Sequence, residues 1–191
     1  MAKNAGKDFE EQLVESCKSL GIFHLRIKDV HIPNDVRELL ARYKKFLPTS
    51  KNKYDFILFD QGCLFSLELK SVNAKSISIT DPKIIKPHQV ESLLEASMYE
   101  NVVSGFIFNF RATDDNGTFF VPIDKYLEYC DIAINGKEYT YKSKVNRSSI
   151  PVGICEEIGI RIKNFKKRTN YHYHVKDFIE QAISQQRGES S

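Results

Sequence analysis

The sequence lacks an apolar run long enough to span a membrane, and its first residues lack the apolar core of a signal peptide. We therefore expect a cytoplasmic protein that makes no membrane contact. It also lacks an internal repeat, a P-loop and a dinucleotide-binding fingerprint. Neither a repeat architecture nor one of these nucleotide-binding motifs is therefore indicated.

Paired cysteine spacing is absent as well. The four cysteines are widely scattered, at positions 17, 63, 130 and 155. Buried free thiols are therefore expected, rather than a disulfide framework or a zinc site. His172 and His174 alternate near the C-terminus, but without acidic or thiol partners they are only a weak indication of a metal site.

The composition is that of an ordinary globular chain. Of its 191 residues, 41% are hydrophobic and 28% are charged, which predicts one domain over 1–191 with a real core. The net charge of +3 is too small to indicate a nucleic-acid partner by itself. Only the local placement of the charges bears on that question.

The periodicity of apolar residues predicts an α/β core. Helical spacing runs over residues 6–20 and a strand follows at 22–27. Residues 54–70 read as two strands joined by a turn, and 71–86 as a polar connector. A helix is expected at 87–99 with Val90, Leu93, Leu94 and Met98 facing inward, then strands at 104–110 and 118–122, a short helix capped by Asp124, and a last helix at 175–184.

Charges stand in the central two-strand stretch where a purely structural hairpin would not need them. Asp55 opens the first strand, and Glu68 and Lys70 lie two apart on the second, so both project from one face. Ionised groups amid so much apolar sequence are costly unless they pair or hold a cation. Two carboxylates beside a lysine are an arrangement suited to divalent metal binding and attack on a phosphodiester.

Two further segments carry a basic bias. Residues 29–53 predict a projecting basic arm, and the C-terminal region interleaves cationic with aromatic side chains that can grip phosphates and stack on exposed bases. A solvated face without a partner is the alternative for the arm. The candidate DNA-binding residues are Arg37, Arg42, Lys44, Lys45, Lys51, Lys53, Lys163, Lys166, Lys167 and Arg168, and residues 185–191 are expected to form a flexible tail.

The order and spacing of several short motifs resemble the PD-(D/E)xK nucleases. More narrowly, they are similar to the RecU-type Holliday junction resolvases of Gram-positive bacteria and their phages. The resemblance covers about residues 6–122. It rests on the opening Gly6 to Glu10, the pair Tyr54-Asp55, the Glu68-x-Lys70 strand, the helix start His88-Gln89-Val90 and the strand Gly105 to Phe108, and extends faintly to Ile150-Pro151.

This resemblance implies a restriction-endonuclease-like fold, a mixed central sheet flanked by helices, with a stalk-like insertion at 29–53 between the first two strands. It further implies a homodimer that cleaves four-way DNA junctions with Mg²⁺ or Mn²⁺ during recombination and repair, and recombination proteins as partners. The chain departs from the family pattern just before Asp55, where Lys51-Asn52-Lys53 replace small hydroxyl residues. The stalk also differs. These two departures bear on the preferred cleavage sequence and on how the junction is bound, more than on the metal chemistry.

The resemblance also suggests a role for each site residue. Asp55 and Glu68 would bind the metal, with the Leu69 backbone carbonyl as a further oxygen ligand. Lys70 would orient the attacking water and stabilise negative charge on the phosphate. Gln89 would position Lys70 or the water, and Glu10 would support the ligands from outside.

Three alternatives stay open from sequence. The charged trio could be a salt-bridged sheet edge, in which Lys70 neutralises Glu68 and Asp55 caps a turn. The enzyme could act on duplex DNA, with or without sequence specificity. Finally, the chain could be a non-catalytic nucleic-acid-binding module on a nuclease scaffold.

Overall fold

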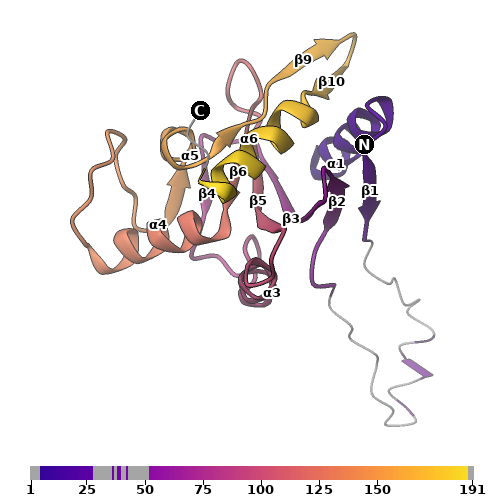
Figure 1. Ribbon diagram of the computed structural model, residues 1–191. Coiled ribbons are helices and arrows are strands. Elements are labelled where there is room, and N and C mark those ends of the chain that lie inside the picture. Colours follow the sequence, from indigo (N-terminus) through magenta and orange to yellow (C-terminus); the bar gives the residue numbers. More distant parts are fainter. Residues whose placement is uncertain (1–4, 28–35, 37, 40–41, 43–51, 189–191) are drawn as a thin grey trace.

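A mixed β-sheet forms the centre of the protein in a computed structural model, which describes residues 5–27, 36, 38–39, 42 and 52–188. Figure 1 shows the arrangement. The six-stranded sheet has the order β1-β2-β3-β5-β6-β8, and β3–β5 is its parallel pair. Its strands are β1 (Phe23–Arg26), β2 (Phe56–Asp60), β3 (Cys63–Val72), β5 (Val102–Phe110), β6 (Gly117–Pro122) and β8 (Ile160–Arg161).

Two apolar cores lie on opposite faces of this sheet. One contains buried side chains of α1 (Ala5–Ser19) and α6 (Val175–Arg187). The other contains those of α3 (Pro87–Ser97), α4 (Ile123–Asn135) and α5 (Val152–Ile158). Strand alternation sorts the side chains between them, since the β5 neighbours Ile107 and Phe106 belong to the first and the second core. The predicted fold class, a mixed sheet flanked by helices, is confirmed.

The early elements follow local sequence signals closely. Helix α1 ends before Gly21, whose φ of 69° lies in the left-handed region that glycine adopts readily. β2 and β3 pair in antiparallel fashion across the turn at Gln61 and Gly62, as the central stretch predicted. The inserted segment lies between β1 and β2, and most of its residues fall outside those that the structure describes.

Several later expectations were wrong. The connector predicted at 71–86 instead carries the end of β3 and a short strand β4 (Ser76–Ser78), which pairs with β7 (Ser149–Pro151). Asp124 lies in the first turn of α4 and Pro122 holds the cap position. Sequence analysis also missed the hairpin of β9 (Asn164–Lys167) and β10 (Asn170–Tyr173). The β4–β7 pairing joins segments far apart along the chain, which local periodicity does not report. β9 and β10 are adjacent in the sequence, but these short, largely polar stretches carry little apolar alternation.

The inner face of α3 also differs from expectation. Gln89, Leu93 and Ala96 are its buried residues, whereas Leu94 and Met98 are exposed. The helix is rotated so that a polar side chain, Gln89, points at the sheet. Its hydrogen bonds with sheet residues, described below, compensate for that burial.

The remaining expectations concern thiols, membranes and the tail. All four cysteines are free and three of them are buried, as predicted. Among the described residues, no helix combines the length and apolarity that crossing a membrane requires. Helix α6 extends to Arg187, so residues 185–187 of the expected flexible tail are helical, and 189–191 lie outside the described residues.

Candidate active site

The candidate site forms where strand β3 runs on past strand β2. The β2–β3 pairing ends at Phe56 with Leu67, so the next residues of β3 extend beyond it. Glu68 and Lys70 project there from one face of β3, and Asp55 directly precedes β2. The structure therefore brings the three predicted residues to one place under the first turn of α3.

Gln89 joins the two charged groups of β3. Its Nε2 atom donates a short hydrogen bond to Oε1 of Glu68, and its Oε1 accepts one from Lys70 Nζ at 3.2 Å. The same Oε1 accepts the backbone N–H of Lys86 at 3.1 Å, which fixes the amide to the start of α3. The helix thus holds the orientation of both Glu68 and Lys70.

Glu68 is almost fully buried, with 1% of its surface exposed. Its pKa is raised to about 8, chiefly because burial removes water from the carboxylate and also because Asp55 lies within hydrogen-bonding reach. The Lys70 ammonium acts in the opposite direction, with Nζ 2.8 Å from Glu68 Oε1. Glu68 therefore keeps its proton up to about pH 8 unless a further positive charge stabilises its ionised form.

Glu10 of α1 lies at the margin of this site. Its pKa is raised, mainly by burial, while Arg26 lowers it and the Asp55 charge raises it again. Arg26, at the end of β1, forms an ion pair with Glu10 and was missed by sequence analysis. Only the position of Arg26 at the end of a strand following the Glu10 helix could have suggested it.

The donor set suits a hard divalent cation. Carboxylate oxygens are the ligands that Mg²⁺ and Mn²⁺ prefer, and a cation would stabilise the ionised form of Glu68, which burial and then Asp55 disfavour. Within the described part of the chain, no three His, Cys, Asp or Glu side chains gather closely enough to form a metal site by themselves. Such an ion would therefore depend on two carboxylates, a backbone oxygen and water.

The predicted basic residues fall into two groups. Lys163, Lys166, Lys167 and Arg168 are exposed on and beside the β9–β10 hairpin. Arg42 is exposed, and Lys53 forms an ion pair with Glu95 of α3 at 2.9 Å. The other candidates of the arm lie outside the described residues; these are Arg37, Lys44, Lys45 and Lys51.

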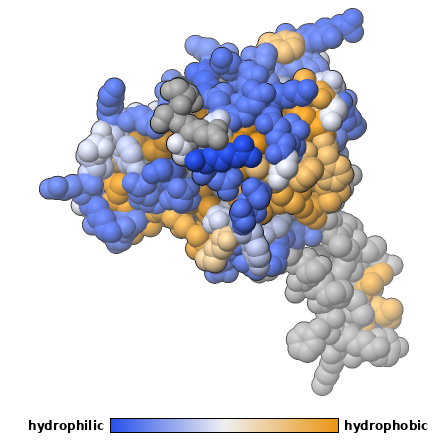
Figure 2. All heavy atoms as spheres, in the orientation of Figure 1, coloured by the Kyte–Doolittle hydropathy of each residue, from blue (hydrophilic) through white to orange (hydrophobic). Residues whose placement is uncertain are grey.

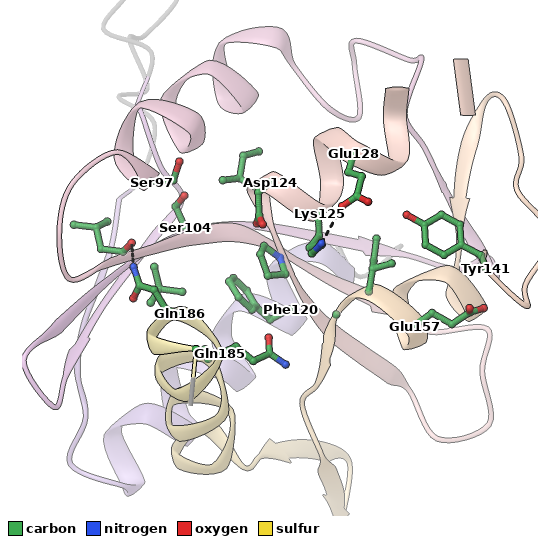
Figure 3. A pocket seen from close by; sticks show the side chains of 18 residues that line it. Ser97, Ser104, Phe120, Asp124, Lys125, Glu128, Tyr141, Glu157, Gln185 and Gln186 are labelled. Carbon is green, nitrogen blue, oxygen red and sulfur yellow. Dashed lines mark hydrogen bonds and ion pairs between the residues drawn. The ribbon is translucent and has the colours of Figure 1, made fainter. Parts of the chain in front are cut away.

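Another groove of the protein lies apart from this site. Figure 3 shows this space of about 890 Å³, bordered by α4, the C-terminal half of α6 and the ends of β5 and β6. Asp124, Glu128 and Glu157 line it against a single cation, Lys125, which pairs with Glu128 at 2.9 Å. Its acidic lining is unsuited to phosphates, and it contains none of the candidate site residues.

The fold and site thus define an α/β protein with a buried glutamate, a partly buried aspartate and a lysine at one end of its mixed sheet. No family model matches the chain. The chain is 42% identical over 185 residues to the SPbeta prophage-derived uncharacterized protein YotM of Bacillus subtilis (strain 168), a match spanning 97% of this chain and 90% of that one. It therefore belongs to the same family as YotM.

One solved structure can also be compared, that of Hjc, a Holliday junction resolvase from Archaeoglobus fulgidus. The two share 10% sequence identity with a TM-score of 0.45, and the match covers 81% of this chain and 93% of Hjc. A likeness at this level carries no weight for activity. The functional proposal rests on the residues of the site.

Proposed function

We propose that the protein is a metal-dependent DNA endonuclease that cleaves four-way junctions. One observation carries the proposal: Glu68, Lys70 and Gln89 are linked by hydrogen bonds, and Asp55 lies within reach of Glu68. A salt-bridged sheet edge would be exposed to solvent. Glu68 is buried instead and retains a raised pKa despite its ammonium partner.

Asp55, Glu68 and the Leu69 backbone carbonyl would hold a Mg²⁺ or Mn²⁺ ion, which when bound polarises a phosphate and makes its bound water more acidic. The Lys70 ammonium supplies positive charge where negative charge grows on the phosphate. Gln89 holds Lys70 and Glu68 in fixed orientations, so neither has to reorganise during the reaction. Glu10, held by Arg26, keeps further negative charge near Asp55.

DNA binding is assigned to the exposed cations of the hairpin region and the inserted segment. A phosphate backbone is bound mainly by lysine and arginine, which displace its condensed counterions. The affinity falls with added salt because the release of those counterions then gains less free energy. We further propose that the enzyme is a cytoplasmic homodimer that meets recombination proteins. These proposals rest on the resemblance to RecU-type resolvases, and sedimentation with and without junction DNA tests the dimer.

The decisive experiment compares the protein with its Asp55→Asn variant on a synthetic four-way junction and on a linear duplex of the same sequence. Wild type should nick the junction in Mg²⁺ or Mn²⁺, and the variant should bind but not cut. Cleavage of both substrates at equal rates would instead favour a duplex endonuclease. If wild type cuts neither substrate with either metal, the protein is a binding module and the nuclease proposal fails.

A further inference from the structure

The β9–β10 hairpin has two faces of different character. On one face, Tyr173 and Asn164 point to the core: Asn116 donates to the Tyr173 hydroxyl at 3.0 Å, and Asn164 donates to the Asn116 carbonyl at 3.2 Å. The backbone N–H of Tyr173 also donates to Ser16 of α1 at 3.0 Å. These buried contacts fix the hairpin against the body of the protein.

The opposite face presents an aromatic surface. Phe165 and His172 are cross-strand partners whose rings stack with centroids 5.4 Å apart and planes 17° from parallel. His174 meets the Phe165 ring edge-on at 5.6 Å. Phe165 is nevertheless 52% exposed, so one side of its ring remains available to a further planar group.

Cations surround this aromatic surface. Lys167 follows Phe165 by two residues on β9 and projects from the same face. Lys163 precedes it by two, and its carbonyl accepts the His174 N–H at 2.9 Å, which extends the hairpin ladder. Residues 158–176 contain no Asp or Glu. Among the described acidic residues, none forms an ion pair with Lys163, Lys166, Lys167 or Arg168.

The β10 edge is less favourable to phosphates than the β9 edge. Glu11 and Glu15 of α1 line a groove of about 810 Å³ together with Asn170 and His172 of β10. Lys7 pairs with Glu11 and Lys18 with Glu15, so this groove offers a phosphate backbone less unpaired positive charge than β9 does. A nucleic-acid strand is therefore expected to run along β9, with its bases turned toward Phe165.

We propose that this face of the hairpin, built on Phe165, His172 and His174 and flanked by Lys163 and Lys167, binds unpaired nucleotides by base stacking. Stacking requires a base with an open π-face, which a single strand offers and an intact duplex does not. The proposal deepens the proposed function by specifying single-stranded segments as part of the substrate. In Figure 1 the hairpin projects at the top of the molecule, at the opposite end from α3. DNA that contacts both the hairpin and the candidate active site beside α3 must therefore be extended.

The test measures binding of the full chain to a fluorescent single strand and to a duplex of equal length, by anisotropy in EDTA. Phe165→Ala should weaken single-strand binding about tenfold and leave duplex binding within about twofold. Phe165→Tyr should restore it, because it restores the ring, and Phe165→Leu should not. Circular dichroism confirms that the variants are folded.

Two control variants separate stacking from charge and from general apolar exposure. Lys166→Ala, on the opposite face from Phe165, should lower single-strand and duplex affinity by the same factor. Phe23→Ala removes a phenylalanine on β1 that is even more exposed, at 61%, and should change neither affinity. Equal single-strand affinity for Phe165→Ala and wild type would overturn the proposal, as would an equal loss on both DNA forms.

This assay contains no metal and no cleavage step. The stacking proposal can therefore fail while the nuclease proposal stands, and the nuclease proposal can fail while the stacking proposal stands. Sedimentation of Phe165→Ala tests whether a second copy of the chain, instead of a nucleic acid, binds the aromatic face. A change in its oligomeric state with single-strand binding unchanged would show that the aromatic face contacts a second copy of the chain, and the nucleotide proposal would be wrong.

Discussion

Lys70 Nζ lies 2.8 Å from Glu68 Oε1, yet the carboxylate it pairs with keeps a pKa of about 8. The ammonium is not strong enough to offset burial and the neighbouring Asp55. The Lys70 ammonium alone thus does not fully stabilise the ionised form of this buried acid. A bound cation can supply the missing positive charge, so the pair can act as more than a structural ion pair.

The stability of the metal-free protein should depend on pH through Glu68. Between its ordinary pKa of 4.5 and about 8, the folded state keeps a proton that the unfolded state has lost, so stability falls as pH rises across this window. The loss is on the order of a few kcal/mol. Urea titrations in EDTA at pH 5, 6.5 and 8 should show this slope in wild type and a smaller one in Glu68→Gln.

An exposed glutamate provides the control for that experiment. Glu128→Gln, at a side chain 53% exposed in the pair with Lys125, should keep the wild-type slope. If Glu68→Gln also keeps it, Glu68 does not carry a raised pKa in the folded state.

Binding of Mg²⁺ or Mn²⁺ should release protons near pH 7. Glu68 holds a proton below about pH 8 and must lose it to ligate a metal, so affinity should rise by up to about tenfold per pH unit between 6 and 8. Calorimetry in buffers of different ionisation enthalpy measures the protons released. Metal binding with no proton release in wild type would exclude Glu68 as a ligand.

Gln89→Ala should slow junction cleavage by about 10- to 100-fold, because Lys70 and Glu68 lose the amide that orients them. The half-maximal pH of cleavage should move upward, since Glu68 loses a donor that favours its charged form. Gln186→Ala, which removes one hydrogen bond to the Val102 carbonyl far from the site, is the matched control and should leave the profile unchanged. An unshifted profile in Gln89→Ala would limit Gln89 to a structural role.

Gly105→Ala should destabilise the protein by about 3 kcal/mol or more, because a Cβ there would lie 2.3 Å from the Val121 carbonyl oxygen on the paired strand. Backbone atoms in a central sheet cannot move aside cheaply. Gly153→Ala is the comparison, since its nearest neighbour is the Ser143 hydroxyl, which can rotate. Urea midpoints for the two variants should differ clearly, and equal midpoints would contradict the close approach.

Junction affinity should fall steeply with salt, and Lys167→Ala should reduce the slope of log K against log salt by about 0.9, as expected for one lost phosphate contact. Lys137→Ala, whose side chain pairs with Asp131, is the control and should keep the wild-type slope. If the junction affinity of wild type does not change with salt, the hairpin cations do not contact DNA.

Local patterns were enough for the elements whose side chains alternate or recur regularly. Strand alternation placed Glu68 and Lys70 on one face, and glycine at 21 and 62 marked real turns. The same reasoning turned α3 the wrong way, because it counted Leu94 and Met98 as core; Gln89 was assigned to the site only through the family resemblance. Hydropathy cannot anticipate a polar residue that is buried to hold two charged partners.

By itself, the sequence determined which residue types stand on each face of β3 and that the chain is a mixed α/β protein, because these follow from the two-residue period of a strand and the helical repeat. Tertiary structure decided the rest: that Asp55 reaches Glu68, that Gln89 closes over both charges, and that Arg26 holds Glu10. It also created the two-faced β9–β10 hairpin. The side-chain relationships of the site join residues distant along the chain, and a pKa near 8 for Glu68 arises only when folding removes water from that carboxylate.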